Sequence, residues 1–232
     1  MLTIRRAAER GYADHGWLET HHTFSFADYQ DPTQMGFRSL RVINEDRVAP
    51  SQGFGMHGHR DMEIVTLVLS GELEHRDSLG HGEILRPGEL QHMSAGTGIR
   101  HSEFNPSKDV PVHLYQIWLL PGQAGLTPSY GQRAFAPAER QNRWQTVASP
   151  TGKEGSLPIQ TDISILLADL AAGGEISYEL PAGRHAWLQV LRGGVTLNGQ
   201  QLFTSDGGAV TGERELLISA KGNAELLLFD LS

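Results

Sequence analysis

Short runs of hydrophobic residues recur along the first half of the chain, with the length and composition of β-strands. Leu40–Ile43, Glu63–Leu69 and His113–Leu120 are rich in β-branched or aromatic residues and are closed by turn-forming residues. Runs of this kind favour strands over helices. No stretch has the sustained 3.6-residue periodicity of an amphipathic helix, and we expect only short helical turns near Asp28 and Pro137.

The second half continues the same pattern after a connection over residues 121–156 that is rich in Gly, Pro, Ser and Gln and is expected to be irregular. Further strands are expected at Ser164–Leu170, Glu175–Leu180, Trp187–Leu191, Val195–Leu197, Leu216–Ser219 and Glu225–Phe229. The pair Asn198-Gly199 is a strong signal for a tight hairpin turn. Many short strands at near-regular spacing predict an all-β sandwich or barrel.

The two halves resemble each other weakly. A strand, a glycine and a second strand follow one another around Gly71, and the same order recurs around Gly193-Gly194. Two copies of one β-barrel unit would explain this repeat, and we expect domains at residues 1–134 and 135–232. The histidines break the symmetry, because ten of the eleven lie in the first half and only His185 lies in the second.

The composition limits the kinds of metal ligand and binding partner that this protein can have. The 232 residues are 39% hydrophobic and 20% charged, which is typical of a globular protein with a sizeable core. The absence of cysteine excludes disulfides and thiolate metal ligands. A net charge of -8 gives no general attraction to nucleic acid, so direct binding to it is not expected. No apolar segment has the pattern of a signal peptide or membrane span, and we expect a cytoplasmic protein. We expect a monomer, because two barrels can bury each other's apolar faces within one chain.

Two short motifs indicate a metal site. His57 and His59 are two residues apart, as are His101 and Glu103. On an extended strand, residues i and i+2 point to the same face, so two paired strands would bring all four side chains together. Three imidazoles and one carboxylate favour a first-row divalent metal and leave positions open for another ligand.

Other polar residues have competing interpretations. Glu63 is either a fifth metal contact or a buried carboxylate paired with Arg60 or Arg100, and we favour the second. For His21 and His22, a satisfied or solvent-facing imidazole is favoured over a place at the pocket mouth. We expect exposed side chains at His75, His81 and His92, core side chains at Met35, Phe37 and Trp118, and either a core or a ligand-supporting place for His113.

Five phrases together resemble the bacterial branch of the pirin family in the cupin superfamily, most strongly between Gly11 and Trp118. They are His22-Thr23-Phe24-Ser25-Phe26, Met35-Gly36-Phe37, Leu40-Arg41-Val42, His57-Gly58-His59-Arg60-Asp61-Met62-Glu63 and Met93-Ser94-Ala95-Gly96-Thr97-Gly98-Ile99-Arg100-His101-Ser102-Glu103. Ordinary cupins use the glutamate that follows the two histidines, here Glu63, as a ligand, whereas the pirin pattern places the carboxylate at Glu103. The second half has no His-x-His pattern.

The resemblance implies a bicupin fold with two stacked, jelly-roll-like β-barrels and a metal site in the N-terminal barrel only. It implies that His57, His59, His101 and Glu103 hold one divalent metal. Fe²⁺ is the expected metal, with Zn²⁺, Ni²⁺, Mn²⁺, Co²⁺ and Cu²⁺ as alternatives.

The resemblance also implies an activity similar to that of quercetin 2,3-dioxygenase, which opens the flavonol C ring with dioxygen and releases carbon monoxide. Glu103 would then be both a ligand and the catalytic acceptor of the substrate hydroxyl proton. One alternative is a metal- or redox-responsive regulatory protein that acts through a protein partner. Another is a structural metal, against which the open coordination positions argue.

Overall fold

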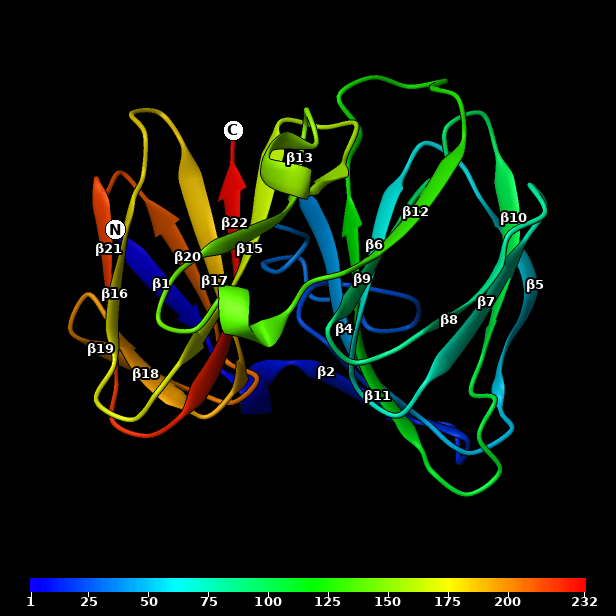
Figure 1. Ribbon diagram of the computed structural model, residues 1–232, viewed down its shortest axis with the longest axis horizontal. Coiled ribbons are helices and arrows are strands. Elements are labelled where there is room, and N and C mark those ends of the chain that lie inside the picture. Colours follow the sequence, from blue (N-terminus) through cyan, green and yellow to red (C-terminus); the bar gives the residue numbers. More distant parts are fainter. The chain divides into compact units, whose positions relative to one another are not determined.

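The computed structural model describes all 232 residues, which form two compact units (Figure 1). The N-terminal unit comprises residues 11–135 and 159–161. The C-terminal unit comprises residues 1–10, 136–158 and 162–232. None of the helices has the length and apolar character needed to cross a bilayer.

The N-terminal unit consists of one seven-stranded and one four-stranded antiparallel sheet. The larger sheet has the order β12 (Ser129–Ala134), β9 (Glu89–Ser94), β6 (Glu63–Ser70), β11 (Val112–Leu119), β4 (Leu40–Val48), β3 (Leu18–His22) and β2 (Gly11–Asp14). The smaller sheet has the order β5 (Gly53–His59), β10 (Ile99–Phe104), β7 (Leu73–Asp77) and β8 (Gly82–Leu85).

The C-terminal unit also has one seven-stranded and one four-stranded sheet. The larger has the order β1 (Leu2–Arg5), β20 (Gly207–Thr211), β17 (His185–Arg192), β22 (Ala224–Leu231), β15 (Ile163–Leu170), β13 (Gln145–Ser149) and β14 (Leu157–Pro158). The smaller has the order β16 (Glu175–Glu179), β21 (Glu215–Ala220), β18 (Gly194–Leu197) and β19 (Gln200–Phe203). The helical turns are η1 (Ala7–Glu9), η2 (Pro137–Glu139) and η3 (Lys153–Gly155).

The sheet orders confirm the all-β class and the internal repeat. The order β9-β6-β11-β4 in one unit matches β20-β17-β22-β15 in the other, and β5-β10-β7-β8 matches β16-β21-β18-β19. One expectation needs correction: each unit has two separate sheets of jelly-roll type, and no sheet closes on itself as a barrel. Two packed sheets bury their inner faces without a continuous ring of hydrogen bonds.

The units depart from the expected ranges 1–134 and 135–232 at the N-terminus and at residues 159–161, which belong to the N-terminal unit. Strand β1 pairs with β20 of the C-terminal unit, with Leu2 opposite Val210 and Arg5 opposite Gly207. In the N-terminal unit, the matching edge beside β9 is covered by β12. Both strands supply backbone partners to an edge that would otherwise be unpaired, and this long-range pairing assigns residues 1–10 to the C-terminal unit.

Some predictions of local structure are confirmed and others are wrong. The hairpin turn at Asn198-Gly199 is confirmed, since both residues have positive φ (44° and 84°) and Leu197 pairs with Gln200. A helical turn occurs at Pro137, whereas a tight turn between Phe26 and Tyr29 takes the place of the one expected near Asp28. The connection over residues 121–156 was wrongly expected to be irregular, because it contains β12 and β13.

The interiors of the two units differ in polarity. In the C-terminal unit one apolar cluster is continuous, and β16 and β21 contribute Ile176, Tyr178, Leu216 and Ile218 to it. In the N-terminal unit the apolar residues form separate clusters, one around Val68 and Leu114 and another around Ile64, Met93, Ala95 and Ile99. The strands that match β16 and β21 are β5 and β10, and these carry the histidines instead.

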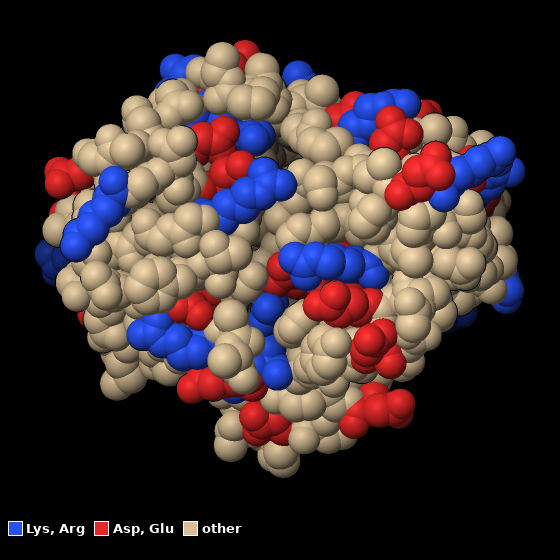
Figure 2. Space-filling view, turned by 90° about the horizontal axis from the view of Figure 1, so that it is seen from below, with Lys and Arg blue, Asp and Glu red and all other residues tan.

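The surface carries mixed charge. On the face shown in Figure 2, Lys and Arg side chains lie next to Asp and Glu side chains. Ion pairs of this kind include Arg86–Glu72 (3.0 Å) in the N-terminal unit and Arg140–Asp169 (2.9 Å) in the C-terminal unit.

Candidate metal centre

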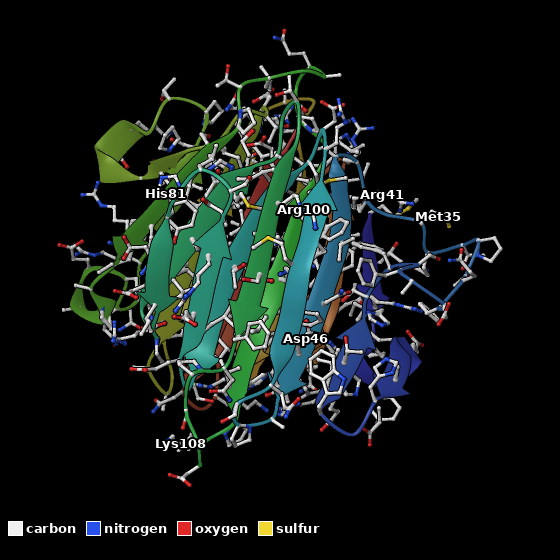
Figure 3. The ribbon with its side chains drawn as sticks, turned by 90° about the vertical axis from the view of Figure 1, so that its right-hand side faces the viewer. Met35, Arg41, Asp46, His81, Arg100 and Lys108 are labelled. Carbon is white, nitrogen blue, oxygen red and sulfur yellow. The ribbon has the colours of Figure 1, made fainter.

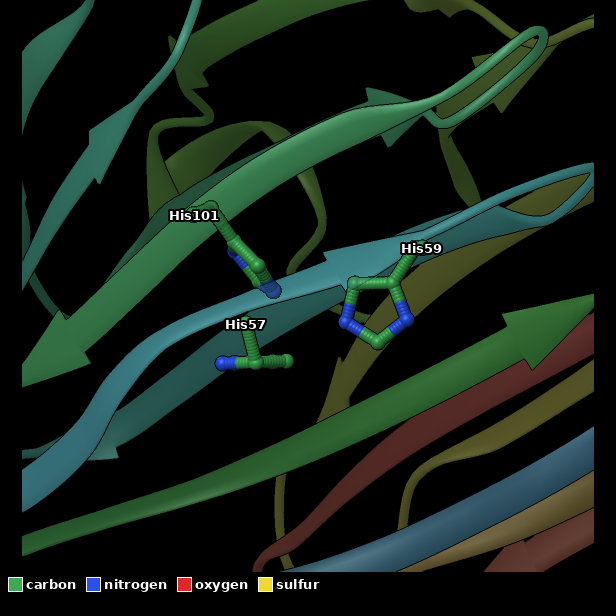
Figure 4. A group of neighbouring side chains, drawn as sticks. All are labelled: His57, His59 and His101. Carbon is green, nitrogen blue, oxygen red and sulfur yellow. The ribbon is translucent and has the colours of Figure 1, made fainter.

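Strands β5 and β10 bring three histidines together. The strands are antiparallel, and their register places His101 directly opposite His57. Ring centroids are 4.4 Å apart for His57 and His101, and 4.8 Å apart for His59 with either of the others. Figure 4 shows the three rings converging from the two strands. The i, i+2 spacing in the sequence thus puts two imidazoles on one face, and strand pairing supplies the third.

Glu103 lies beside these histidines, but its carboxyl group is grouped with His75 and His101. A register irregularity between His101 and Glu103 shifts the pairing, so that Glu103 lies opposite Phe54. The potential ligand atoms of His57, His59 and His101 lie within 4.8 Å of one another, and those of His75, His101 and Glu103 form another such group. His101 belongs to both groups.

Unsatisfied polar atoms mark this place as suited to a cation. His101 and Glu103 are 1% and 2% exposed, and neither Nε2 of His101 nor Oε1 of Glu103 has a hydrogen-bond partner. A buried polar atom without a partner destabilises the folded state by about 1–3 kcal/mol. Imidazole nitrogen and carboxylate oxygen are both ligands of first-row divalent metals, so the side chains present fit such an ion.

The protonation states favour metal binding. Burial, followed by the neighbouring His57 and His59, lowers the pKa of His101 to about 2. Burial and the charge of His57 lower the pKa of His59 to about 4. Both imidazoles are therefore neutral near pH 7 and have a free lone pair. The Nδ1 atom of His57 lies 2.8 Å from the backbone carbonyl of Gly55, which requires the proton on Nδ1 and leaves Nε2 as the free nitrogen.

The carboxyl of Glu103 is held by two residues that the sequence did not single out for this role. Gln116 Nε2 donates to Glu103 Oε2 (2.7 Å), and Trp118 Nε1 donates to Gln116 Oε1 (3.1 Å). Burial raises the pKa of Glu103 to about 7, the Gln116 hydrogen bond opposes this, and Asp46 adds to it. The alternation along β11 could have identified Gln116 and Trp118, because residues two apart share a face.

A cavity of about 330 Å³ opens beside these side chains. That volume lies within the usual range of small-molecule sites. Its lining consists of His15, Leu18, Thr20, His22, Phe26, Ala27, Asn44, Asp46, Phe54, His57, His59, Glu103, Gln116 and Trp118. Apolar and aromatic side chains therefore face three potential ligands and the carboxyl group of Asp46, whose position on a strand is marked in Figure 3.

Glu63 is a buried carboxylate, as favoured, but its expected arginine partner is wrong. The side chain is fully buried and accepts hydrogen bonds from His92 Nε2 (2.7 Å), Ser94 Oγ (2.6 Å) and the backbone N–H of Gln160 (3.0 Å). Burial alone would raise its pKa, yet these donors lower it below the usual value of 4.5.

Several other expectations for single residues are corrected. His75 and His92 are buried, at 1% and 3% exposed, because each lies on a strand with its side chain turned inward. For His22 the favoured satisfied imidazole is confirmed, since the ring is buried and bonds to Asn44 Oδ1 (2.9 Å), and it also lines the cavity.

The three residues expected in the core, Met35, Phe37 and Trp118, are not fully buried, and His113 does not line the cavity. Met35 is 45% exposed on a loop away from the strands in Figure 3, and Phe37 is half-buried. Trp118 packs edge-on against His59 with centroids 4.9 Å apart, so it belongs to the cavity wall. His113 lies 2.9 Å from Glu45 and does not line the cavity.

Two jelly-roll-like units, one of which has a histidine cluster beside a cavity, define a two-domain cupin. Comparison with known proteins agrees. The model of the pirin family matches residues 3–119, and that of the quercetinase C-terminal cupin domain matches residues 146–231. The chain belongs to the pirin family.

Full-length relatives extend this comparison. The chain is 49% identical over 231 residues to a quercetin 2,3-dioxygenase of Escherichia coli K12, covering 100% of this chain and 99% of the relative. It is 42% identical over 221 residues to a pirin-like protein of Caulobacter vibrioides, covering 95% of each. The crystal structure of a bacterial pirin from E. coli in complex with nickel(II) is 49% identical, covers 100% of this chain and 99% of that chain, and superposes with a TM-score of 0.96.

Proposed function

We propose that this protein is a metal-dependent dioxygenase that opens the central ring of a flavonol such as quercetin and releases carbon monoxide. The observation that carries the proposal is the pair of buried, unpartnered ligand atoms on His101 and Glu103 beside a cavity of small-molecule size. The full-length similarity to quercetin 2,3-dioxygenases supports the same reaction.

The proposed ligands of one divalent metal are His57, His59, His101 and Glu103. The nickel(II) complex of the E. coli relative supports a divalent ion, and we propose Fe²⁺ as the native one because the reaction consumes dioxygen. When bound, the metal supplies Lewis acidity and an open position for the substrate oxygen. In this assignment Oε1 of Glu103, which has no hydrogen-bond partner, supplies the carboxylate ligand, while Oε2 accepts from Gln116.

The cavity residues orient the substrate. Leu18, Phe26, Phe54 and Trp118 provide apolar and aromatic surface for a flat polyphenol. Their exclusion of water strengthens each polar contact made inside the cavity.

Glu103 is the proposed proton acceptor. Its carboxyl group lines the cavity, so a carboxylate oxygen can accept the proton of a substrate hydroxyl bound there. Asp46 lies in the same cavity wall and has one unpartnered oxygen, Oδ1, which is available to a second substrate hydroxyl.

Iron-dependent turnover tests the proposal. Purified protein loaded anaerobically with Fe²⁺ is mixed with quercetin and oxygen, and flavonol absorbance, oxygen uptake and carbon monoxide are followed. We expect turnover in the wild type and its loss in a folded His101→Ala variant. The control His185→Ala should keep wild-type turnover, because His185 lies in the C-terminal unit, where it bonds to Thr211 of the same unit. Absence of turnover in fully loaded wild-type protein would refute the proposal, and a partner affinity that differs between ferrous and ferric protein would favour a regulatory role. The monomeric state, the cytoplasmic location and the confinement of metal to the N-terminal unit remain predictions.

A further inference from the structure

A chain of three side chains leads from the candidate metal centre into β7. Strand β7 pairs with β10, so that His75 lies opposite Glu103 and Asp77 lies opposite His101. Nδ1 of His75 is 3.5 Å from Nδ1 of His101, and Nε2 of His75 is 3.2 Å from Oδ2 of Asp77. All three side chains are buried, which leaves them no water to satisfy alternative hydrogen bonds.

Asp77 can only accept hydrogen bonds here. Its Oδ1 accepts from the backbone N–H groups of Leu79 (2.9 Å) and His81 (3.1 Å), and its Oδ2 accepts from the imidazoles of His75 and His81 (3.2 and 2.9 Å). Burial raises the pKa of this carboxyl, but the four donors outweigh burial and hold the pKa below its usual 3.8. The group is therefore an ionised carboxylate near pH 7.

This carboxylate determines where the imidazole protons lie. Nε2 of His75 faces Asp77 and its Nδ1 faces His101, so a neutral ring carries its one proton on one of these two nitrogens. The contact with Asp77 requires that proton on Nε2, which makes Nδ1 of His75 an acceptor. Nδ1 of His101 must then donate to it, and Nε2 of His101 retains a free lone pair.

We infer that Asp77, acting through His75, fixes the tautomer of His101 so that Nε2 is presented to the metal. Both residues are positioning residues, and the inference rests on the metal site proposed above. Tyr130 stabilises the arrangement by stacking on His75 and His81, with centroid distances of 4.8 and 4.7 Å and interplanar angles of 22° and 21°. Partners that set the tautomer of a ligating histidine typically change metal affinity by about 10- to 100-fold when they are lost.

The substitution Asp77→Asn reverses the direction of the hydrogen bonds that link residue 77, His75 and His101, with almost no change in the shape of the side chain. The amide oxygen takes the place of Oδ1, because two backbone N–H groups must be accepted there. The NH₂ group then lies at the place of Oδ2 and donates to Nε2 of His75. That contact moves the His75 proton to Nδ1, which now donates to Nδ1 of His101 and leaves the His101 proton on the nitrogen that would bind metal. His81 lies at the margin of the strands in Figure 3, with its side chain 38% exposed, and can change tautomer freely.

The matched control is His81→Ala. This variant removes one imidazole from the same carboxylate, yet Asp77 remains an acceptor for His75. A second test variant, His75→Phe, keeps an aromatic ring against Tyr130 but removes the acceptor for Nδ1 of His101.

The test combines two readouts on metal-free, folded protein: histidine ¹⁵N NMR for the tautomers, and competition titration for the affinity of Ni²⁺. We expect His101 protonated at Nδ1 in the wild type and in His81→Ala, with equal Ni²⁺ affinities. We expect protonation at Nε2 in Asp77→Asn, both tautomers in His75→Phe, and Ni²⁺ affinity lowered about 10- to 100-fold in each. Unchanged tautomers in both variants, or unchanged affinity despite reversed tautomers, would overturn the inference. A wild type that binds no Ni²⁺ would refute the metal site instead, while the metal-free spectra would still report the tautomers.

Discussion

Replacing Glu63 by glutamine tests whether this buried carboxylate is charged and stabilising. The change is isosteric, but glutamine has only one accepting oxygen for the three donors His92, Ser94 and the Gln160 amide. Hydrogen bonds to a charged group contribute about 1.5–3 kcal/mol each, and neutral ones about 0.5–1.5 kcal/mol. A loss of about 1 kcal/mol at each bond predicts that Glu63→Gln lowers the free energy of unfolding by about 2–4 kcal/mol at pH 7.

The pH dependence of this effect follows from the direction of the pKa shift. The folded pKa of Glu63 lies below the usual 4.5, so its stabilisation is complete above the unfolded pKa and is lost as pH falls through the folded pKa. Glutamine does not titrate. The stability difference between wild type and Glu63→Gln should therefore be constant near neutral pH and shrink on acidification below about 4.5.

Urea unfolding over a pH series, followed by tryptophan fluorescence, measures this difference. The control Glu83→Gln alters an exposed carboxylate of the same unit and should change stability little at any pH. A stability difference between wild type and Glu63→Gln that is independent of pH down to about 3 would show that Glu63 is not ionised in the folded protein.

Three further substitutions test the strand pairing, the cavity wall and the hairpin turn. A Cβ atom at Gly53 would lie 2.2 Å from the backbone oxygen of Glu103, so Gly53→Ala should separate β5 from β10, lower the thermal midpoint and weaken Ni²⁺ binding in a titration. Trp118→Ala removes the ring packed against His59 and should raise KM for quercetin by about 2- to 12-fold in steady-state assays, since aromatic contacts contribute about 0.5–1.5 kcal/mol. Asn198→Val places a β-branched residue at φ 44° and should reduce stability by about 1–2 kcal/mol in thermal unfolding, with Ni²⁺ affinity unchanged.

Much of the site could be predicted because its signal is local. The i, i+2 spacing of His57 with His59, and of His101 with Glu103, needs only strand geometry to place pairs of side chains on one face. The same rule was available for His75, which alternates with the buried Leu73 on β7. It was expected to be exposed because of the turn nearby.

Other features depend on contacts between distant parts of the sequence, which local patterns do not report. Glu63 bonds to Gln160, 97 residues away, and β1 pairs with β20 some two hundred residues later. The division of each unit into two open sheets likewise depends on which strand edges pair, and the short hydrophobic runs are equally compatible with a closed barrel.

The protonation states of the candidate metal ligands also depend on the three-dimensional structure. Glu103 and His101 have unusual pKa values because of burial and of neighbours on other strands, such as Gln116 on β11. A sequence motif identifies the ligand types, but packing determines whether they are neutral, oriented and unpartnered.

The most direct test of the account is the position of iron in crystals of the Fe²⁺-loaded protein, measured by anomalous scattering at the iron edge. We expect one strong peak about 2 Å from Nε2 of His57, His59 and His101 and from a carboxylate oxygen of Glu103. A peak held by His75, His101 and Glu103 without His57 and His59, or a peak in the C-terminal unit, would contradict it.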